Sequence, residues 1–208
     1  HGQVGEPENP IKPASSRIRI IVTIGLAALA LLPLYGTSFS QVLAIDILIF
    51  ALFAASLHFL LGLGGMVSFG HAAYYGGGAY VAALLVTHLN TPMELAFMLA
   101  PIGAGVAALA IGWVCLRSTG VYFAMLTLAF AQLLWSLVFQ WGDVTGGDDG
   151  LVNIWPSDWL NETTTYFYFT IITAVGGIVV LRHIAHSPFG YALRAARDSK
   201  RQAEVTGI

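Results

Sequence analysis

The sequence predicts an all-α, polytopic membrane protein with about six transmembrane helices, and three observations support this fold class. Of 208 residues, 57% are hydrophobic and only 10% are charged, whereas roughly a quarter of an average soluble domain is charged. Mean hydropathy is +0.75. The apolar residues gather in runs near the roughly 20 residues that a helix needs to cross about 30 Å of hydrocarbon. We therefore expect a multi-pass protein embedded in the lipid bilayer.

Six apolar runs are long enough, or nearly so, to be membrane spans. They cover residues 18–35, 42–61, 74–89, 95–116, 121–140 and 166–184. The third run is short unless it begins near Val67, so residues 62–78 either form its start or make a bent or re-entrant segment before it. Irregular glycine-rich backbone at membrane depth is tolerated where it is buried in protein or lines a cavity. The sequence thus predicts a broken segment before span three.

The basic residues predict the orientation, because Lys and Arg are retained on the cytoplasmic side. With six spans and a cytoplasmic N-terminus, that side holds Lys12, Arg17, Arg19, Arg117, Arg182, Arg194, Arg197, Lys200 and Arg201. The opposite side carries Glu94, Asp143, Asp148, Asp149, Asp158 and Glu162 and no basic residue. We expect a flexible cytoplasmic tail at 1–17, with an expression remnant as an alternative for 1–13. A transmembrane domain at 18–184 and a cytoplasmic segment at 185–208 follow.

Small residues recur at helical spacing in two of the runs. Residues 100, 104, 108 and 112 are Ala, Ala, Ala and Gly, and residues 72, 76, 79 and 83 are Ala, Gly, Ala and Ala. Lipid tails are as apolar as leucine, so membrane helices associate where small residues let their backbones approach. We expect both stripes to form tight seams between helices.

Polar groups at membrane depth are candidates to line a substrate path, because burying them is costly. Asp46 and His58 lie in the second run, and Ser68 and His71 lie in the glycine-rich segment. Asp46 can instead be a solvated interfacial carboxylate, and the histidines can serve packing or capping. Asp46 and His58 are twelve residues apart, or about 120° around a helix, so they do not share a face.

Motifs for catalysis, cofactors and other partners are weak. Ser68 and His71 could form a nucleophile and a base, but no third orienting group is evident. An ATP-binding P-loop needs G-x-x-x-x-G-K-[ST], and neither Lys12 nor Lys200 lies in that context. We expect no enzyme activity, no metal and no cofactor in this chain. The net charge of −2 also argues against nucleic acid as a partner.

The C-terminal segment has the signals of amphipathic helices. Ser187 can cap a helix that has Pro188 at its first position. Asp198 can cap a second short helix, which Gly207 can end. This arrangement would present Arg194, Arg197, Lys200 and Arg201 to the cytoplasm.

Four segments in order resemble one known family. They are 62–80 (GLGGMVSFGHAAYYGGGAY), 117–130 (RSTGVYFAMLTLAF), 144–151 (VTGGDDGL) and 188–198 (PFGYALRAARD) with 202–208 after it. Together they resemble the LivM family, the permease subunits of branched-chain amino acid ABC importers, over roughly residues 42–208. Family members continue with further spans, so the resemblance implies a C-terminally truncated member.

The resemblance implies an importer of the bacterial inner membrane that works by alternating access. This subunit would pair with a LivH-type permease subunit, two cytoplasmic ATPase subunits that bind ATP and Mg²⁺, and a periplasmic substrate-binding protein. Branched-chain amino acids are the family's default substrates, and urea or short amides are the alternative. A passive channel or a membrane scaffold is the rival class, and ATP dependence separates it from an importer.

The resemblance also gives expected roles to individual residues. The substrate path would include Asp46, His58, Ser68, His71, Gly76, Gly77 and Gly78. A periplasmic turn would contain Thr145, Gly146, Gly147, Asp148, Asp149 and Gly150, in an acidic loop that is a candidate docking surface for the binding protein. Coupling to the ATPases would involve Gly190, Arg194, Arg197, Asp198, Glu204 and Gly207.

Overall fold

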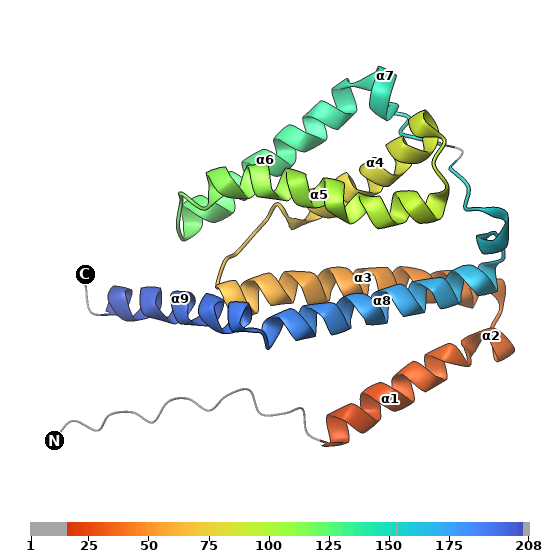
Figure 1. Cartoon of the computed structure of the whole chain (residues 1–208), viewed down its shortest axis with the longest axis horizontal. Coiled ribbons are helices and arrows are strands. Elements are labelled where there is room, and N and C mark those ends of the chain that lie inside the picture. Colours follow the sequence, from red (N-terminus) through yellow and green to blue (C-terminus); the bar gives the residue numbers. More distant parts are fainter. Residues whose placement is uncertain (1–15, 153, 206–208) are drawn as a thin grey trace.

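The computed structural model describes residues 16–152 and 154–205, and every regular element within them is a helix (Figure 1). The long helices are α3 (Ser38–Gly64), α4 (His71–Leu89), α5 (Met93–Cys115), α6 (Val121–Gln140), α8 (Thr163–Ala185) and α9 (Pro188–Val205). The shorter elements are α1 (Ser16–Ala30), α2 (Leu32–Tyr35), α7 (Gly142–Thr145) and the 3-10 turn η1 (Asp158–Leu160). The all-α class is confirmed, and most of the expected N-terminal tail lies outside the described residues.

Four helices are long and apolar enough to cross a membrane, namely α3, α5, α6 and α8. Helix α4 has 19 residues, but its three tyrosines, three glycines and two histidines lower its hydropathy. Helix α1 has 15 residues, and at 1.5 Å per residue it is about 22 Å long, short of the roughly 30 Å hydrocarbon layer. The described residues support four spans, and the count of six and the orientation stay predictions.

The helices form two layers that lie one above the other in Figure 1. The first layer contains α4, α5 and α6, with α7 at one end. The second layer contains α3 and α8, with α9 packed against both and α1 lying beside them. In this second layer Phe167 is fully buried against Ala44 and Ile45. Leu52 of α3 packs on Gly177 of α8, where an added Cβ would come within 2.8 Å of a leucine methyl.

The first layer is joined by small residues, in part as predicted. A Cβ on Gly78 of α4 would lie 3.7 Å from Ala104 of α5, and one on Gly103 would lie 2.8 Å from Val81. Gly76 and Gly112 instead face open space, with no atom within 4 Å of an added Cβ. Of the predicted stripes only Ala104 takes part in these contacts, and the other partners, Gly78, Val81 and Gly103, lie outside the stripes.

The break before span three is shorter than the predicted stretch 62–78. The backbone is non-helical only at residues 65–70, because Gly64 still ends α3 and Gly76–Gly78 continue α4. Gly65 adopts a left-handed φ of +62° and donates its N–H to Leu61 O at 3.1 Å. A glycine in this conformation is a common way to end a helix. Tight packing of α4 on α5 offsets the low helix propensity of its three glycines.

The C-terminal segment is one helix rather than the two predicted short helices. Ser187 caps α9 as expected, since its Oγ accepts the N–H of Gly190 at 3.4 Å. Asp198 lies inside α9 and does not begin a second helix. Its carboxylate binds Arg197 instead, which removes the reason for a new helix start. Gly207 lies outside the described residues.

Candidate functional site

The two layers are connected at the break between α3 and α4, which is the candidate site. Phe69 donates its N–H to Oγ1 of Thr127 on α6 at 3.2 Å. Thr127 is buried, and its hydroxyl donates to Ala124 O at 2.8 Å. Gly70 lies so close to α6 that an added Cβ would be 2.5 Å from Thr127 O. The far end of the break is therefore fixed to α6, and only glycine fits at position 70.

A second polar contact ties α4 back to α3. The Nε2 atom of His71 lies 2.7 Å from Ser56 Oγ. The Ser56 hydroxyl also lies 2.7 Å from Phe53 O, and both contacts form together when Ser56 donates to that carbonyl and Nε2 donates to Ser56 Oγ. The imidazole also packs on the Phe53 ring with centroids 5.1 Å apart. His71 thus joins two helices of different layers.

The structure separates the predicted path residues. Ser68 is buried in the break and His71 begins α4, so these two belong to the junction. His71 is bonded to Ser56 and not to Ser68, so the serine–histidine pair considered from sequence is not formed. Asp46 is exposed on α3, about 18 Å along the helix from His58.

The three glycines of the predicted path lie in two different surroundings. Gly78 lies in the seam between α4 and α5, near Ala104. Gly76 and Gly77 have open space on their side-chain positions. None of the three is in the non-helical segment. Their position leaves room beside α4, but the described residues bring no polar side chain of the predicted set to Gly76 or Gly77.

His58 belongs to a groove between the two helices of the second layer. The groove has a volume of about 380 Å³ and is lined by Ala55, His58, Phe59, Gly62, Leu63, Ile178, Leu181, Arg182 and Ala185. Its walls are apolar except for His58 and Arg182. Both come from the same end of the α3–α8 pair, next to the start of α9.

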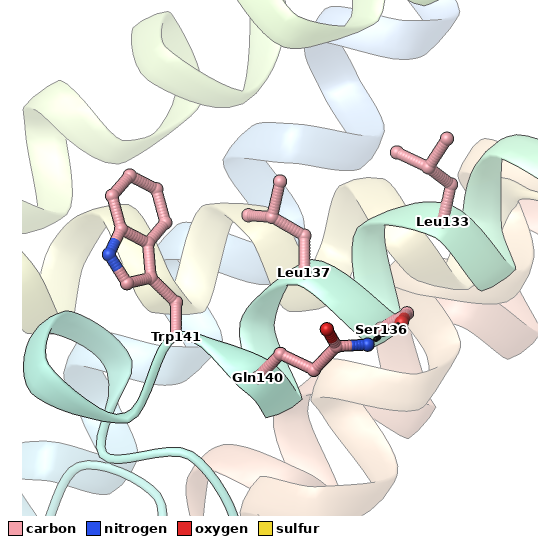
Figure 2. A pocket seen from close by; sticks show the side chains of 5 residues that line it. All are labelled: Leu133, Ser136, Leu137, Gln140 and Trp141. Atoms are coloured by element: carbon pink, nitrogen blue, oxygen red, sulfur yellow. Dashed lines mark hydrogen bonds between the residues drawn. The ribbon is translucent and has the colours of Figure 1, made fainter.

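A larger hollow of about 490 Å³ lies beside α6 (Figure 2). Its lining residues are Leu133, Ser136, Leu137, Gln140 and Trp141. All five come from α6 and the residue that ends it. Gln140 donates from Nε2 to Ser136 Oγ at 2.7 Å on the helix surface. Because one helix supplies the whole lining, this hollow is a surface face and not an enclosed site.

The predicted glycine-rich turn follows α7, at the opposite end of the molecule from α9 (Figure 1). Gly146, Gly147 and Gly150 have φ values of +76°, +56° and +65°. The buried Thr145 hydroxyl donates to Trp141 O at 2.8 Å and is also within hydrogen-bond distance of Val138 O. Asp148 and Asp149 are exposed at the tip. The turn displays two carboxylates at its tip.

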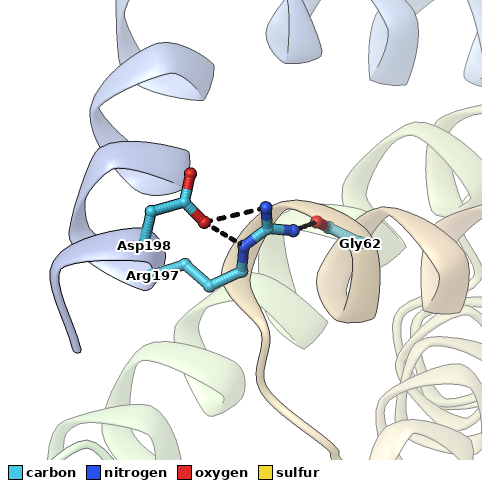
Figure 3. Close-up of polar contacts among 3 residues, drawn as sticks. All are labelled: Gly62, Arg197 and Asp198. Atoms are coloured by element: carbon cyan, nitrogen blue, oxygen red, sulfur yellow. Dashed lines mark hydrogen bonds and ion pairs between the residues drawn. The ribbon is translucent and has the colours of Figure 1, made fainter. Parts of the chain in front are cut away.

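The predicted coupling residues face inward more than expected. Gly190 is buried, and an added Cβ would lie 2.4 Å from Ala185 O. Arg194 donates from Nη2 to the same carbonyl at 2.8 Å. Arg197 donates to Gly62 O and pairs with Asp198, as Figure 3 shows.

The expected cytoplasmic position of Arg194 and Arg197 stays a prediction, and the structure adds that each has a partner within the protein. Both side chains bind carbonyls at helix C-termini, where the unpaired oxygens and the helix dipole favour a cation. Glu204 is a residue of α9, and Gly207 lies beyond the described residues.

Two residues of the junction were missed by sequence reasoning. Thr127 belongs to the 117–130 motif without a role of its own there, and no sequence pattern marks Ser56. A hydroxyl inside an apolar run is a weak signal, because most such groups bond their own helix. Its pairing with His71 depends on how α4 folds back against α3, which no local pattern gives.

The fold and the junction define a class, a helical membrane protein in which two layers of helices meet at a broken segment. Comparison with protein families then identifies the group within this class. The model of the family described as "Branched-chain amino acid transport system / permease component" matches residues 40–208. The chain belongs to this family, and the LivM-type resemblance seen in four sequence motifs is confirmed.

Two curated relatives give the same result. The chain is 29% identical over 107 residues to the high-affinity branched-chain amino acid transport system permease protein LivM of Escherichia coli (strain K12), covering 51% of this chain and 25% of the relative. The LivM protein of Salmonella typhimurium (strain LT2) matches with the same identity and coverage. The match thus spans about a quarter of the length of these relatives. No solved structure matches the chain.

Proposed function

We propose that the chain is the membrane-spanning permease subunit of an ATP-driven importer of branched-chain amino acids. The family match over residues 40–208 is the observation that carries this proposal. The substrate class rests on the names of the two LivM relatives, which are permease proteins of a high-affinity branched-chain amino acid transport system. Four helices with the length and composition of membrane spans support placement in a membrane.

The energy would come from separate ATPase subunits that hold ATP and Mg²⁺. Neither Lys12 nor Lys200 lies in a P-loop sequence, so the chain needs partners to use ATP. The other partners would be a LivH-type permease subunit and a periplasmic substrate-binding protein. In this assembly α9 is on the cytoplasmic side of the bacterial inner membrane, and the turn after α7 is on the periplasmic side.

Alternating access would use the two layers as moving parts. The layers are tied by a few contacts, among them His71 with Ser56 at the break and Trp159 with Glu94 at the other end. A two-layer arrangement with a non-helical connection can open on one side while it closes on the other. The buried Ser68 and the imidazole of His71 then stand at the junction where a path between the layers would narrow.

The test is uptake of radiolabelled leucine into liposomes that contain the complete importer, assembled from the full-length protein and the products of its neighbouring genes. Uptake is measured with and without ATP inside the liposomes and with the matched binding protein outside. We expect leucine uptake that requires ATP. Uptake without any ATP dependence in a verified assembly would overturn the importer and favour a channel or scaffold.

The same liposomes separate the substrate from the mechanism. Urea and a basic amino acid are tested in parallel with leucine. ATP-dependent uptake of urea alone would keep the importer and replace the substrate class. Uptake of leucine, with the basic amino acid excluded, is the result that the proposal expects.

A further inference from the structure

Two arginines of α9 lie on one face of the helix and bind the ends of two different helices. Arg194 donates to Ala185 O, the last residue of α8. Arg197, three residues later, donates to Gly62 O, near the end of α3. Carbonyls at a helix C-terminus have no partner within the helix, so each arginine gives a hydrogen bond to an otherwise unpaired acceptor. The negative end of the helix dipole also stabilises the positive charge there. Helix α9 is thereby fastened to both members of the second layer.

Arg197 is held in place from two sides. Its Nε and Nη2 atoms lie 2.9 Å from one oxygen of Asp198, which leaves Nη1 directed at Gly62 O (Figure 3). The side chain of Arg197 is 33% exposed, against 54% for Asp198. Asp198 therefore faces outward and orients the guanidinium, while Arg197 reaches into the protein.

The stem of Arg197 also covers the first residue of the break. A Cβ added to Gly65 would lie 2.7 Å from Arg197 Cγ, so this stem rests directly on the Gly65 backbone. Leu193, one turn earlier in α9, lies beside Gly64, at 3.9 Å from a Cβ added there. The contact of α9 with α3 is therefore centred on the point where α3 ends and the break begins.

The other end of the break is fixed to the first layer. Phe69 and Gly70 are held against Thr127 of α6. Residues 65–70 are thus clasped by α9 at one end and by α6 at the other. A continuous set of contacts leads from Arg197 through the break to α6. In such a set, displacement of α9 has a physical route to the first layer.

We propose that Arg197 is the positioning residue that transmits movement of α9 to the break between α3 and α4. It couples ATP hydrolysis to transport without touching ATP or substrate. This inference rests on the proposed function, and it gives the coupling segment an inward-facing role in addition to its contact with an ATPase. Asp198 assists by fixing the direction of the guanidinium.

The experiment measures leucine uptake and ATP hydrolysis on the same preparation of the complete importer, so that uptake per ATP can be calculated. In Arg197→Ala we expect ATP hydrolysis within about twofold of the wild type and uptake per ATP reduced at least about fivefold, the lower range of site-to-site coupling effects. Arg197→Lys keeps a donor for Gly62 O and should recover part of the ratio. Arg117→Ala removes one positive charge from the same end of the molecule, in the connection between α5 and α6, and should leave the ratio unchanged.

A tether gives an independent readout that a merely structural role would not produce. Gly64→Cys and Leu193→Cys are combined with Arg197→Ala in a background without other reactive cysteines, and the pair is joined with a short bifunctional thiol reagent. If Arg197 acts by fastening α9 to the end of α3, cross-linking should raise uptake per ATP toward the wild-type value. Reduction of the cross-link should lower it again.

The outcomes separate this inference from the proposed function. A wild-type importer without ATP-dependent uptake would remove the proposed function itself. A wild type that transports, with Arg197→Ala showing an unchanged ratio or an equal fall in hydrolysis and uptake, would overturn only the role of Arg197. If Arg197→Ala does not assemble, Asp198→Asn replaces it, with a smaller loss of ratio expected and an unchanged ratio counting against the proposal.

Discussion

The two layers of the molecule are held together by different means. In the layer of α3 and α8, a fully buried aromatic ring, Phe167, fills the interface, and α9 caps the helix ends with arginines. In the layer of α4, α5 and α6, small residues such as Gly78 and Ala104 bring the backbones together. Between the layers the contacts are few and include polar ones. The difference indicates two firm units with a connection that can rearrange.

Contacts between the layers lie in three places. At one end Trp159, in η1, donates to Glu94 at the start of α5. In the membrane-spanning part the rings of Phe97 and Phe169 meet edge to face, with centroids 5.3 Å apart. The break provides the remaining contacts. A unit that must move against another is expected to use few contacts between the units and many within each.

The largest expected effect is on the interior of the second layer. Phe167→Ala removes a fully buried ring and should destabilise the protein by about 3–5 kcal/mol, because the cavity cannot be filled by its neighbours. Thermal unfolding of the purified importer in detergent measures this loss. Phe50→Ala, on the same layer at a position 65% exposed, is the matched control. Equal losses for the two variants would contradict the description of Phe167 as the centre of the layer.

A smaller effect is expected at the break. Gly70→Ala places a Cβ about 2.5 Å from the Thr127 carbonyl, and backbone atoms cannot move aside as a flexible side chain can. Overpacking of this kind costs about 1–3 kcal/mol. We expect leucine uptake by the importer to fall more steeply than its thermal stability, because the junction is displaced.

Gly105→Ala is the control for that variant, since it makes the same chemical change in open space on α5. It should leave uptake and thermal stability close to those of the wild type. If Gly70→Ala behaved like Gly105→Ala, the close approach of the break to α6 would have no functional consequence.

The smallest effect is expected for the polar contact between the layers. A double-mutant cycle of Ser56→Ala and His71→Ala should give a coupling energy of about 0.6 kcal/mol, the average for hydrogen bonds between membrane helices. Thermal unfolding of the two single variants and the double variant measures it. A coupling near zero would mean that the bond between Ser56 and His71 does not contribute to holding the layers.

Much of the site's chemistry could be read from the sequence, but its grouping could not. Ser68 and His71 were expected in one segment, and both lie at the junction. Asp46 and His58 lie about 18 Å apart along α3, as twelve positions in a straight helix require, and their place in a substrate path stays a prediction. The hydroxyls that complete the junction belong to Ser56 and Thr127, on helices that local patterns cannot place beside the break.

The C-terminal segment shows the same division. Ser187 and Pro188 predicted the start of α9, and the structure has that start. The predicted second helix at Asp198 was wrong. A residue with a strong capping preference can also lie inside a helix when another partner is available, and Arg197 is that partner.

The sequence by itself determined that this protein is an all-α membrane protein of the branched-chain amino acid permease family. Apolar run length, charge distribution and motif order are local properties of the chain, and burying a backbone in lipid leaves few folds to choose from. The tertiary structure decided which faces meet: the separation into two layers, the short break clasped by α9 and α6, and the inward turn of Arg194 and Arg197. Those features depend on contacts between residues far apart in the chain. The lipid environment does not by itself favour one pairing of apolar helix faces over another. Close packing and unpaired carbonyls at helix ends select them.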